Sequence, residues 1–107
     1  MLEVHKEEII QIHRVLYLIS EYLREVGVVQ EMPEYERLLV RPFHVNKPRE
    51  EHMMASLILS KELLENILRN KGGEESCDDH ELYIAIKALE NMISRKREKI
   101  RRSSGRK

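Results

Sequence analysis

A seven-residue repeat near the start of the chain constrains the fold more than any other feature. Its positions are separated alternately by four and three residues: His5, Ile9, Ile12, Leu16, Ile19, Leu23 and Val26. This spacing places the side chains on one stripe of an α-helix and is typical of helices that pack against other helices. It predicts a helix over residues 3–26, which Gly27 ends.

The apolar stripe is wider than one neighbouring helix can cover. Four more apolar side chains extend it: Val15, Tyr17, Leu18 and Tyr22. Two further amphipathic helices are expected over residues 48–70 and 78–102. We therefore expect an all-α fold in which residues 1–102 form one domain. Its three main helices form a bundle that a homodimer completes.

The expected second helix has Pro48 in its first turn, where a missing N–H is tolerated, and it ends before Gly72. Its buried face is expected to comprise Met53, Met54, Leu57, Ile58, Leu64, Ile67 and Leu68. The expected third helix has an apolar face made of Leu82, Ile86, Leu89, Ile93 and Ile100. Both patterns favour packing of these helices against one another.

A long connection over residues 27–47 holds two prolines and shows no helical period. We expect a short helical turn near Pro33 to Leu38 and then an extended piece from Val40 to Val45, because the prolines keep either segment short. At the other end, residues 103–107 are expected to form a flexible basic tail.

The composition favours a cytoplasmic protein. The single cysteine cannot form an internal disulfide, and acidic residues stand where a targeting peptide is apolar or basic. The longest apolar run has five residues, against the roughly 20 that span a bilayer, so no membrane partner is expected. Abundant charge with only two glutamines also fits a thermophilic source.

Motifs for the common enzyme chemistries are missing from the chain. It contains no glycine-rich phosphate loop, no His-Glu-x-x-His, no Cys-x-x-Cys and no serine on a glycine-flanked elbow. The leading hypothesis is therefore a non-enzymatic, self-associating binding or assembly module. An enzyme with a metal-activated water is the second alternative.

The histidines are candidate ligands for a divalent metal such as zinc. The candidates are His5, His13, His44 and His52, with Glu51 as a carboxylate member and Glu8 as a further one. Histidines eight residues apart on a helix are separated by about 12 Å, so one ion cannot bind both, and a site has to combine different segments.

The competing interpretation is that these histidines belong to the core. His13 then packs at the core edge and bonds to a backbone carbonyl or to Tyr17. Cys77 and His80 form a further Cys-x-x-His half-site, but two ligands do not complete a metal site, and surface positions are the simpler interpretation.

Two separated motifs resemble a small archaeal family of uncharacterised proteins. One motif is His5 to His13, and the other is Pro42-Phe43-His44-Val45-Asn46-Lys47 followed by Glu51-His52 and Ala55. The resemblance covers about residues 4–68. It departs from the family pattern at Asn46, where the family has another histidine, and at Met53-Met54, where the family is more polar. It implies an all-helical, archaeal, cytoplasmic protein and places histidines in both motifs, but it implies no activity.

The net charge of zero conceals two opposite halves. Residues 94–107 carry eight Lys or Arg and one acid, whereas residues 1–93 carry 11 basic and 18 acidic residues. The basic cluster comprises Arg95, Lys96, Arg97, Lys99, Arg101 and Arg102. It is a solvated helix end, a nucleic-acid contact through phosphates, or one half of an antiparallel pairing between the third helices of two copies. Nucleic-acid binding is the first alternative function.

Overall fold

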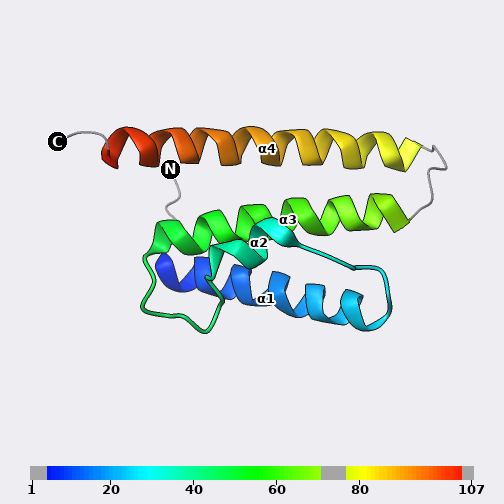
Figure 1. The fold of residues 1–107 in the computed structure, drawn as a ribbon, viewed down its shortest axis with the longest axis horizontal. Helices are drawn as coiled ribbons and strands as arrows, with labels where there is room; N and C mark the ends of the chain where they lie inside the picture. Colours follow the sequence, from blue (N-terminus) through cyan, green and yellow to red (C-terminus); the bar gives the residue numbers. More distant parts are fainter. Residues whose placement is uncertain (1–4, 71–76, 105–107) are drawn as a thin grey trace.

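The computed structural model describes residues 5–70 and 77–104, and this part of the chain is helical without any strand. Its elements are α1 (Lys6–Glu25), α2 (Pro33–Leu38), α3 (Arg49–Asn70) and α4 (Cys77–Ser104). Three of the four helices are long, and α2 is a single short one (Figure 1). The predicted all-α class is therefore confirmed.

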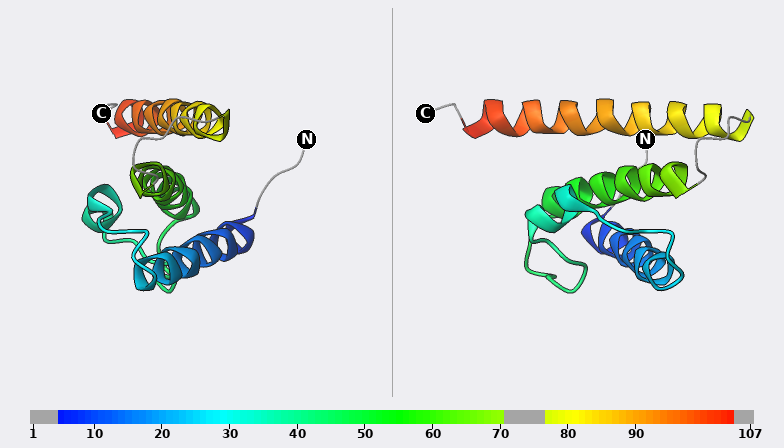
Figure 2. Two further views of the ribbon diagram at one scale, coloured as in Figure 1. Left: turned by 90° about the vertical axis from the view of Figure 1, so that its right-hand side faces the viewer. Right: turned by 45° about the vertical axis from the view of Figure 1, so that its right-hand side comes forward.

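Helix α3 is the centre of the arrangement. Helices α1, α2 and α4 all contact α3, but within the described residues α1 and α4 do not contact each other. Figure 2 shows α4 on one side of α3 and α1 on another, with α2 beside α3. The expected bundle is consequently open, because α3 alone links the two outer long helices.

The helix boundaries lie close to those expected. Helix α1 begins at Lys6 rather than at residue 3, and the backbone N–H of His5 donates to the Glu8 carboxylate over 3.0 Å. Gly27 adopts a φ of 85° just beyond the helix, as its predicted role as a stop requires. Helix α4 continues to Ser104, so the expected tail starts later than residue 103, and residues 105–107 lie outside the described part.

The connection between α1 and α3 contains one correct and one wrong prediction. The short helix at Pro33–Leu38 is confirmed, but the expected extended piece from Val40 to Val45 is replaced by turns. The His44 N–H donates to the Arg41 carbonyl over 2.9 Å, with Pro42 at the position that prolines favour in such a turn. The Arg41 N–H also donates to His44 Nδ1 over 3.0 Å, which fixes the turn locally.

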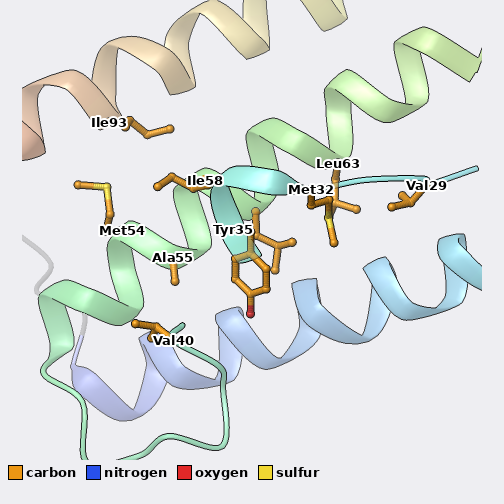
Figure 3. Close-up of a cluster of buried hydrophobic side chains, with 10 residues drawn as sticks. Val29, Met32, Tyr35, Val40, Met54, Ala55, Ile58, Leu63 and Ile93 are labelled. Atoms are coloured by element: carbon orange, nitrogen blue, oxygen red, sulfur yellow. The ribbon is translucent and has the colours of Figure 1, made fainter. Parts of the chain in front are cut away.

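The core forms where α1, α2 and α4 meet α3. Its buried members are Val29, Met32, Tyr35, Val40, Met54, Ala55, Ile58, Leu59, Leu63 and Ile93 (Figure 3). Of the predicted face of α3, Met54 and Ile58 are buried, and the other five residues are half-buried. The carboxylate of Glu62 binds α2 to α3, because it accepts the backbone N–H groups of Glu34 and Tyr35 over 2.9 and 2.8 Å.

Candidate functional site

Two of the histidines singled out in the sequence meet in the centre of the molecule. His13 of α1 and His52 of α3 are fully buried, and their Nδ1 atoms lie 2.9 Å apart. His13 Nε2 lies 2.7 Å from the hydroxyl of Tyr35, which points from α2 toward α1 in Figure 3. His52 Nε2 lies 2.8 Å from the carbonyl oxygen of His44. The pair therefore connects all three of these helices with the loop before α3.

One arrangement of protons satisfies every hydrogen bond in this series of neutral groups, which runs from Tyr35 through the two histidines to the His44 carbonyl. The His44 carbonyl can only accept, so His52 Nε2 donates and the neutral His52 ring accepts at Nδ1. The Nδ1–H of His13 is then the donor to His52, and His13 Nε2 accepts from the Tyr35 hydroxyl. All four ring nitrogens of the two histidines therefore take part in these hydrogen bonds.

The electrostatic surroundings keep His13 and Tyr35 uncharged. Burial, together with the nearby His52, Arg41 and His44, lowers the pKa of His13 to about 4. Burial also raises the pKa of Tyr35 to about 12, although the Arg41 guanidinium lies 4.5 Å from the centre of the Tyr35 ring. Both groups are neutral at pH 7, as the proton arrangement requires.

The remaining predicted ligands lie elsewhere. His5 is exposed before the first turn of α1, and Glu51 faces solvent 3.8 Å from Lys47 Nζ. His44 contributes its carbonyl to His52, while its own Nδ1 accepts from Arg41. No group of three or more His, Cys, Asp or Glu side chains in the described residues could hold a metal ion.

Metal binding stays a prediction. The competing interpretation is that the histidines belong to the core, and the hydrogen bonds of His13 and His52 are contacts of that kind. A metal at His13 or His52 would have to replace one of the hydrogen bonds described above. Sequence reasoning missed Tyr35 as the hydroxyl partner and named Tyr17, which is four residues from His13 along α1. The only signal for such a partner was that a buried imidazole needs one. Of the Cys77–His80 half-site, His80 is exposed, and the Cys77 side chain lies outside the described residues.

Part of the predicted basic cluster is engaged inside the chain. Lys96 Nζ lies 2.9 Å from the Glu50 carboxylate, and Arg97 lies 3.3 Å from the Glu34 carboxylate. Nucleic-acid binding stays a prediction, for which the exposed Arg95 and Lys99 are available. The predicted contacts Arg101 and Arg102 belong to α4, but their side chains lie outside the described residues.

The apolar face of α4 is used within the chain as well. Ile86 and Ile93 are buried, and Leu82 and Leu89 are half-buried on the same stripe. A pairing between the α4 helices of two copies needs an apolar stripe such as Leu82, Ile86 and Leu89 to supply its affinity. In this structure that stripe packs on α3, so such a pairing would have to displace α3 or use other residues.

Helix α1 presents a second apolar stripe that no other element of the described residues covers. We define the outer face of α1 as Ile12, Val15, Ile19, Tyr22 and Val26, which follow one another at intervals of three and four residues. Their exposed fractions range from 43% at Ile19 to 63% at Tyr22. Leu18, at the edge of this face, is 58% exposed. Such spacing is the seam of a coiled-coil type of packing, here without a partner helix.

The outer face of α1 is turned away from α2. At 3.6 residues per turn, the outer face lies on the side of α1 opposite Tyr17, whose ring packs 6.4 Å from that of Tyr35 in α2. On α3, a half-buried strip with the same spacing lies opposite Glu62, which binds α2. We define this α3 strip as Met53, Leu57, Ser60, Leu64 and Ile67. Figure 2 shows α2 on one side of α1 and α3. By their spacing relative to Tyr17 and Glu62, the outer face of α1 and the α3 strip lie on the other side.

Exposed apolar residues elsewhere do not form a comparable seam. On α4, Tyr83, Ile84 and Met92 are exposed, but they are spread over roughly half of the helix circumference. Leu39, Phe43 and Val45 are exposed in the turns before α3. The outer face of α1 is the largest regularly spaced apolar surface on the described residues.

Comparisons with known proteins agree with the resemblance seen in the motifs. The sequence model of a family described as "Uncharacterised protein family UPF0058" matches residues 4–80. A UPF0058 protein of Archaeoglobus fulgidus is 32% identical over 80% of this chain and 92% of its own length. One of Methanocaldococcus jannaschii is 27% identical over 94% of this chain and 99% of its own length.

A third relative, a UPF0058 protein of Methanothermobacter thermautotrophicus, is 31% identical over 64% of this chain and 69% of its own length. No solved structure matches the chain. Among the described residues, no helix combines the length and apolar character needed to cross a membrane.

Proposed function

The chain belongs to the uncharacterised protein family UPF0058, and we propose that it works as a self-associating helical module whose assembly surface is the outer face of α1. The proposed partner is a second copy of the chain. The observation that carries the proposal is the exposed seam of five apolar residues. The inner side of the same helix packs in the core of the monomer, and this packing does not use the seam.

The size of the surface supports a specific interface. With Leu18, its six side chains present roughly 600 Å² of mostly apolar area, at the upper limit of what monomeric proteins expose in one patch. A stable pair of proteins buries about 800 Å² per partner, which the adjacent α3 strip brings within reach. Moving this apolar seam from water into a dimer interface is favourable, so its burial stabilises the dimer.

The arrangement favours a second copy over an unrelated helix. A twofold pair needs only one self-complementary surface, and a heptad seam is self-complementary by construction. Among the described residues, no helix lies on the side of α1 and α3 opposite α2, and we propose that helices of a partner pack there. A pair of chains would then bury the α1 surfaces in one continuous helical core.

The test is the mass of the protein in solution. Sedimentation velocity and light scattering of the full chain should give twice the 12.8 kDa chain mass at micromolar concentration. The double change Val15→Asp and Ile19→Asp places two carboxylates in the seam and should yield a folded monomer, because neither side chain contributes to the buried core.

The matched control is Ile84→Asp on α4, where the side chain is 52% exposed, much as at Val15. This variant should remain a dimer with unchanged helical circular dichroism. A native chain that is monomeric at micromolar concentration would overturn the proposal. So would a dimer that survives the α1 changes but is lost in the α4 variant, because the interface would then lie on α4.

A further inference from the structure

We infer that the two α1 helices of the pair run antiparallel and cross near Ile19, with Arg14 of each copy beside Glu25 of the other. This inference rests on the proposed function, since it assigns the arrangement of the partner at the same surface. It follows from the charges that border the outer face of α1 and from the position of the seam's midpoint.

The border of the outer face carries charges that the monomer leaves without ion pairs. Glu7 lies on the edge marked by Leu18 before the seam begins. Over the length of the seam, residues 12–26, the exposed charged residues of that edge are Arg14, Glu21 and Glu25. No ion pair joins any of these three to another of the described residues, whereas Arg24, farther around the helix, lies 3.8 Å from Glu36. The edge therefore presents one cation followed by two carboxylates, all available to a partner.

An antiparallel pair brings these opposite charges together. The seam is centred on Ile19, so a twofold axis there sets Ile12 of one copy opposite Val26 of the other. The same axis sets Arg14 within one residue of the level of the partner's Glu25, an offset of about 1.5 Å along the helix. Because a perpendicular twofold axis places equal edges side by side, two equivalent Arg14–Glu25 pairs form.

A parallel pair does not bring these charges together. Its twofold axis runs along the helices, so the edge marked by Leu18 lies beside the opposite edge of the partner helix. Arg14 of one copy and Glu25 of the other are then about 16 Å apart along the helix, and no ion pair joins them. A parallel pair would also align the two helix dipoles, whereas the antiparallel pair sets each positive helix end beside a negative one. Leu18, close to the axis, meets its own counterpart in the antiparallel arrangement and extends the apolar seam toward this edge.

Disulfide trapping distinguishes the two orientations. In a Cys77→Ser background, the single variants Ile12→Cys and Val26→Cys are oxidised separately and as a mixture. The antiparallel pair predicts a disulfide between the two variants in the mixture and little with either one alone, because residue 12 lies about 21 Å along the helix from its own counterpart. Self-linking of both variants, or no link in the mixture while the proteins remain dimeric, would overturn the inference.

Charge exchange gives a second measurement that does not alter the seam. Arg14→Glu alone should weaken the dimer roughly threefold to tenfold, and Arg14→Glu combined with Glu25→Arg should restore it. The control is Arg24→Glu, at a position away from this edge, which should leave the dimer constant unchanged. A dimer constant that Arg14→Glu leaves unchanged would overturn the inference, because Arg14 would then have no charged partner in the other copy.

The failure of this inference and that of the proposed function remain distinct. A parallel dimer overturns the orientation alone, while a monomeric parent chain overturns the assembly itself. Light scattering on the parent before oxidation separates these outcomes.

Discussion

The two sides of α1 are built from different kinds of residue. The inner side consists of Ile9, His13, Leu16, Ser20 and Leu23, and it includes two polar side chains that are fully buried. The Ser20 hydroxyl donates to the Tyr17 carbonyl over 2.6 Å, and His13 is bonded at both ring nitrogens. The outer face has only apolar side chains and the Tyr22 hydroxyl, and it lies in water.

This difference shows how one helix can serve two purposes. Hydrogen bonds in a dry environment accept one geometry, so the inner side fixes where α1 lies on α2 and α3. An apolar seam imposes no hydrogen-bond geometry on its partner. The free energy of association comes mainly from the apolar area that the two surfaces bury. We therefore expect changes on the inner side to affect folding and changes on the outer face to affect assembly.

The largest effect is expected from His13→Ala on the inner side. The change removes a fully buried ring and leaves the Tyr35 hydroxyl and His52 Nδ1 without partners. We expect the free energy of unfolding to fall by about 3–5 kcal/mol. Urea unfolding in the Val15→Asp, Ile19→Asp background measures this without a contribution from dimerisation.

The matched control for this change is His5→Ala, at an exposed position of the same helix, which should alter stability by less than about 0.5 kcal/mol. A decrease in the free energy of unfolding below about 1 kcal/mol in the His13 variant would mean that the hydrogen bonds of His13 contribute little to folding.

The second effect is a loss of stability in mild acid. The pKa of His13 is lowered from 6.5 to about 4 in the folded chain, so the unfolded chain binds more protons between these values. Stability should therefore be complete above pH 6.5 and decline as the pH falls toward 4, by about 3 kcal/mol in total. Protonation also gives the His13 Nε2 a hydrogen where it now accepts from Tyr35.

Unfolding measured between pH 5 and 7 lies above the ordinary carboxylate pKa values near 4.5. Burial raises the pKa of Glu62, but a raised carboxyl pKa lowers stability as the pH rises, so it opposes the acid effect of His13. A His13→Gln variant should lose most of the slope in this range. An equal slope in the variant and the parent would assign the acid sensitivity to other groups.

The third effect concerns the outer face and should be confined to assembly. Tyr22→Ser removes the most exposed ring of the seam, so the monomer should keep its stability within about 0.5 kcal/mol. The dimer should weaken by roughly tenfold to thirtyfold, since aromatic residues dominate such interfaces. Sedimentation equilibrium measures this constant, and Tyr83→Ser on α4 is the control with 60% exposure against 63%.

The helices were accessible from the sequence because their signals are local. Apolar period, Gly27, Pro33 and Pro48 act within a few residues, so the three long helices and the short one were predicted to within a few residues. The turns at Arg41 to Lys47 were not predicted, because their hydrogen bonds involve the His44 ring and depend on exact backbone geometry.

The candidate sites required information that the sequence does not carry. The stripe of α1 was recognised as too wide for one neighbour, but the division into an inner side and an outer face depends on where α3 lies. The pairing of His13 with His52 spans 39 positions, and no spacing rule indicates that their Nδ1 atoms meet. The ion pair between Lys96 and Glu50 spans 46 positions, and no spacing rule indicates it either.

The smallest effect is expected from added metal, and it tests the inner side against the metal hypothesis. Zinc binds imidazole through an unprotonated ring nitrogen, and each such nitrogen in His13 and His52 accepts a hydrogen bond from a neighbour. We therefore expect tag-free protein, purified without chelators, to contain well under one zinc, nickel or iron per chain, and added zinc to leave the melting temperature unchanged. Elemental analysis beside a His52→Ala variant decides the matter. Near-stoichiometric metal that disappears in that variant would show that the histidines exchange their hydrogen bonds for an ion, and it would make the inner side a binding site as well as a structural contact.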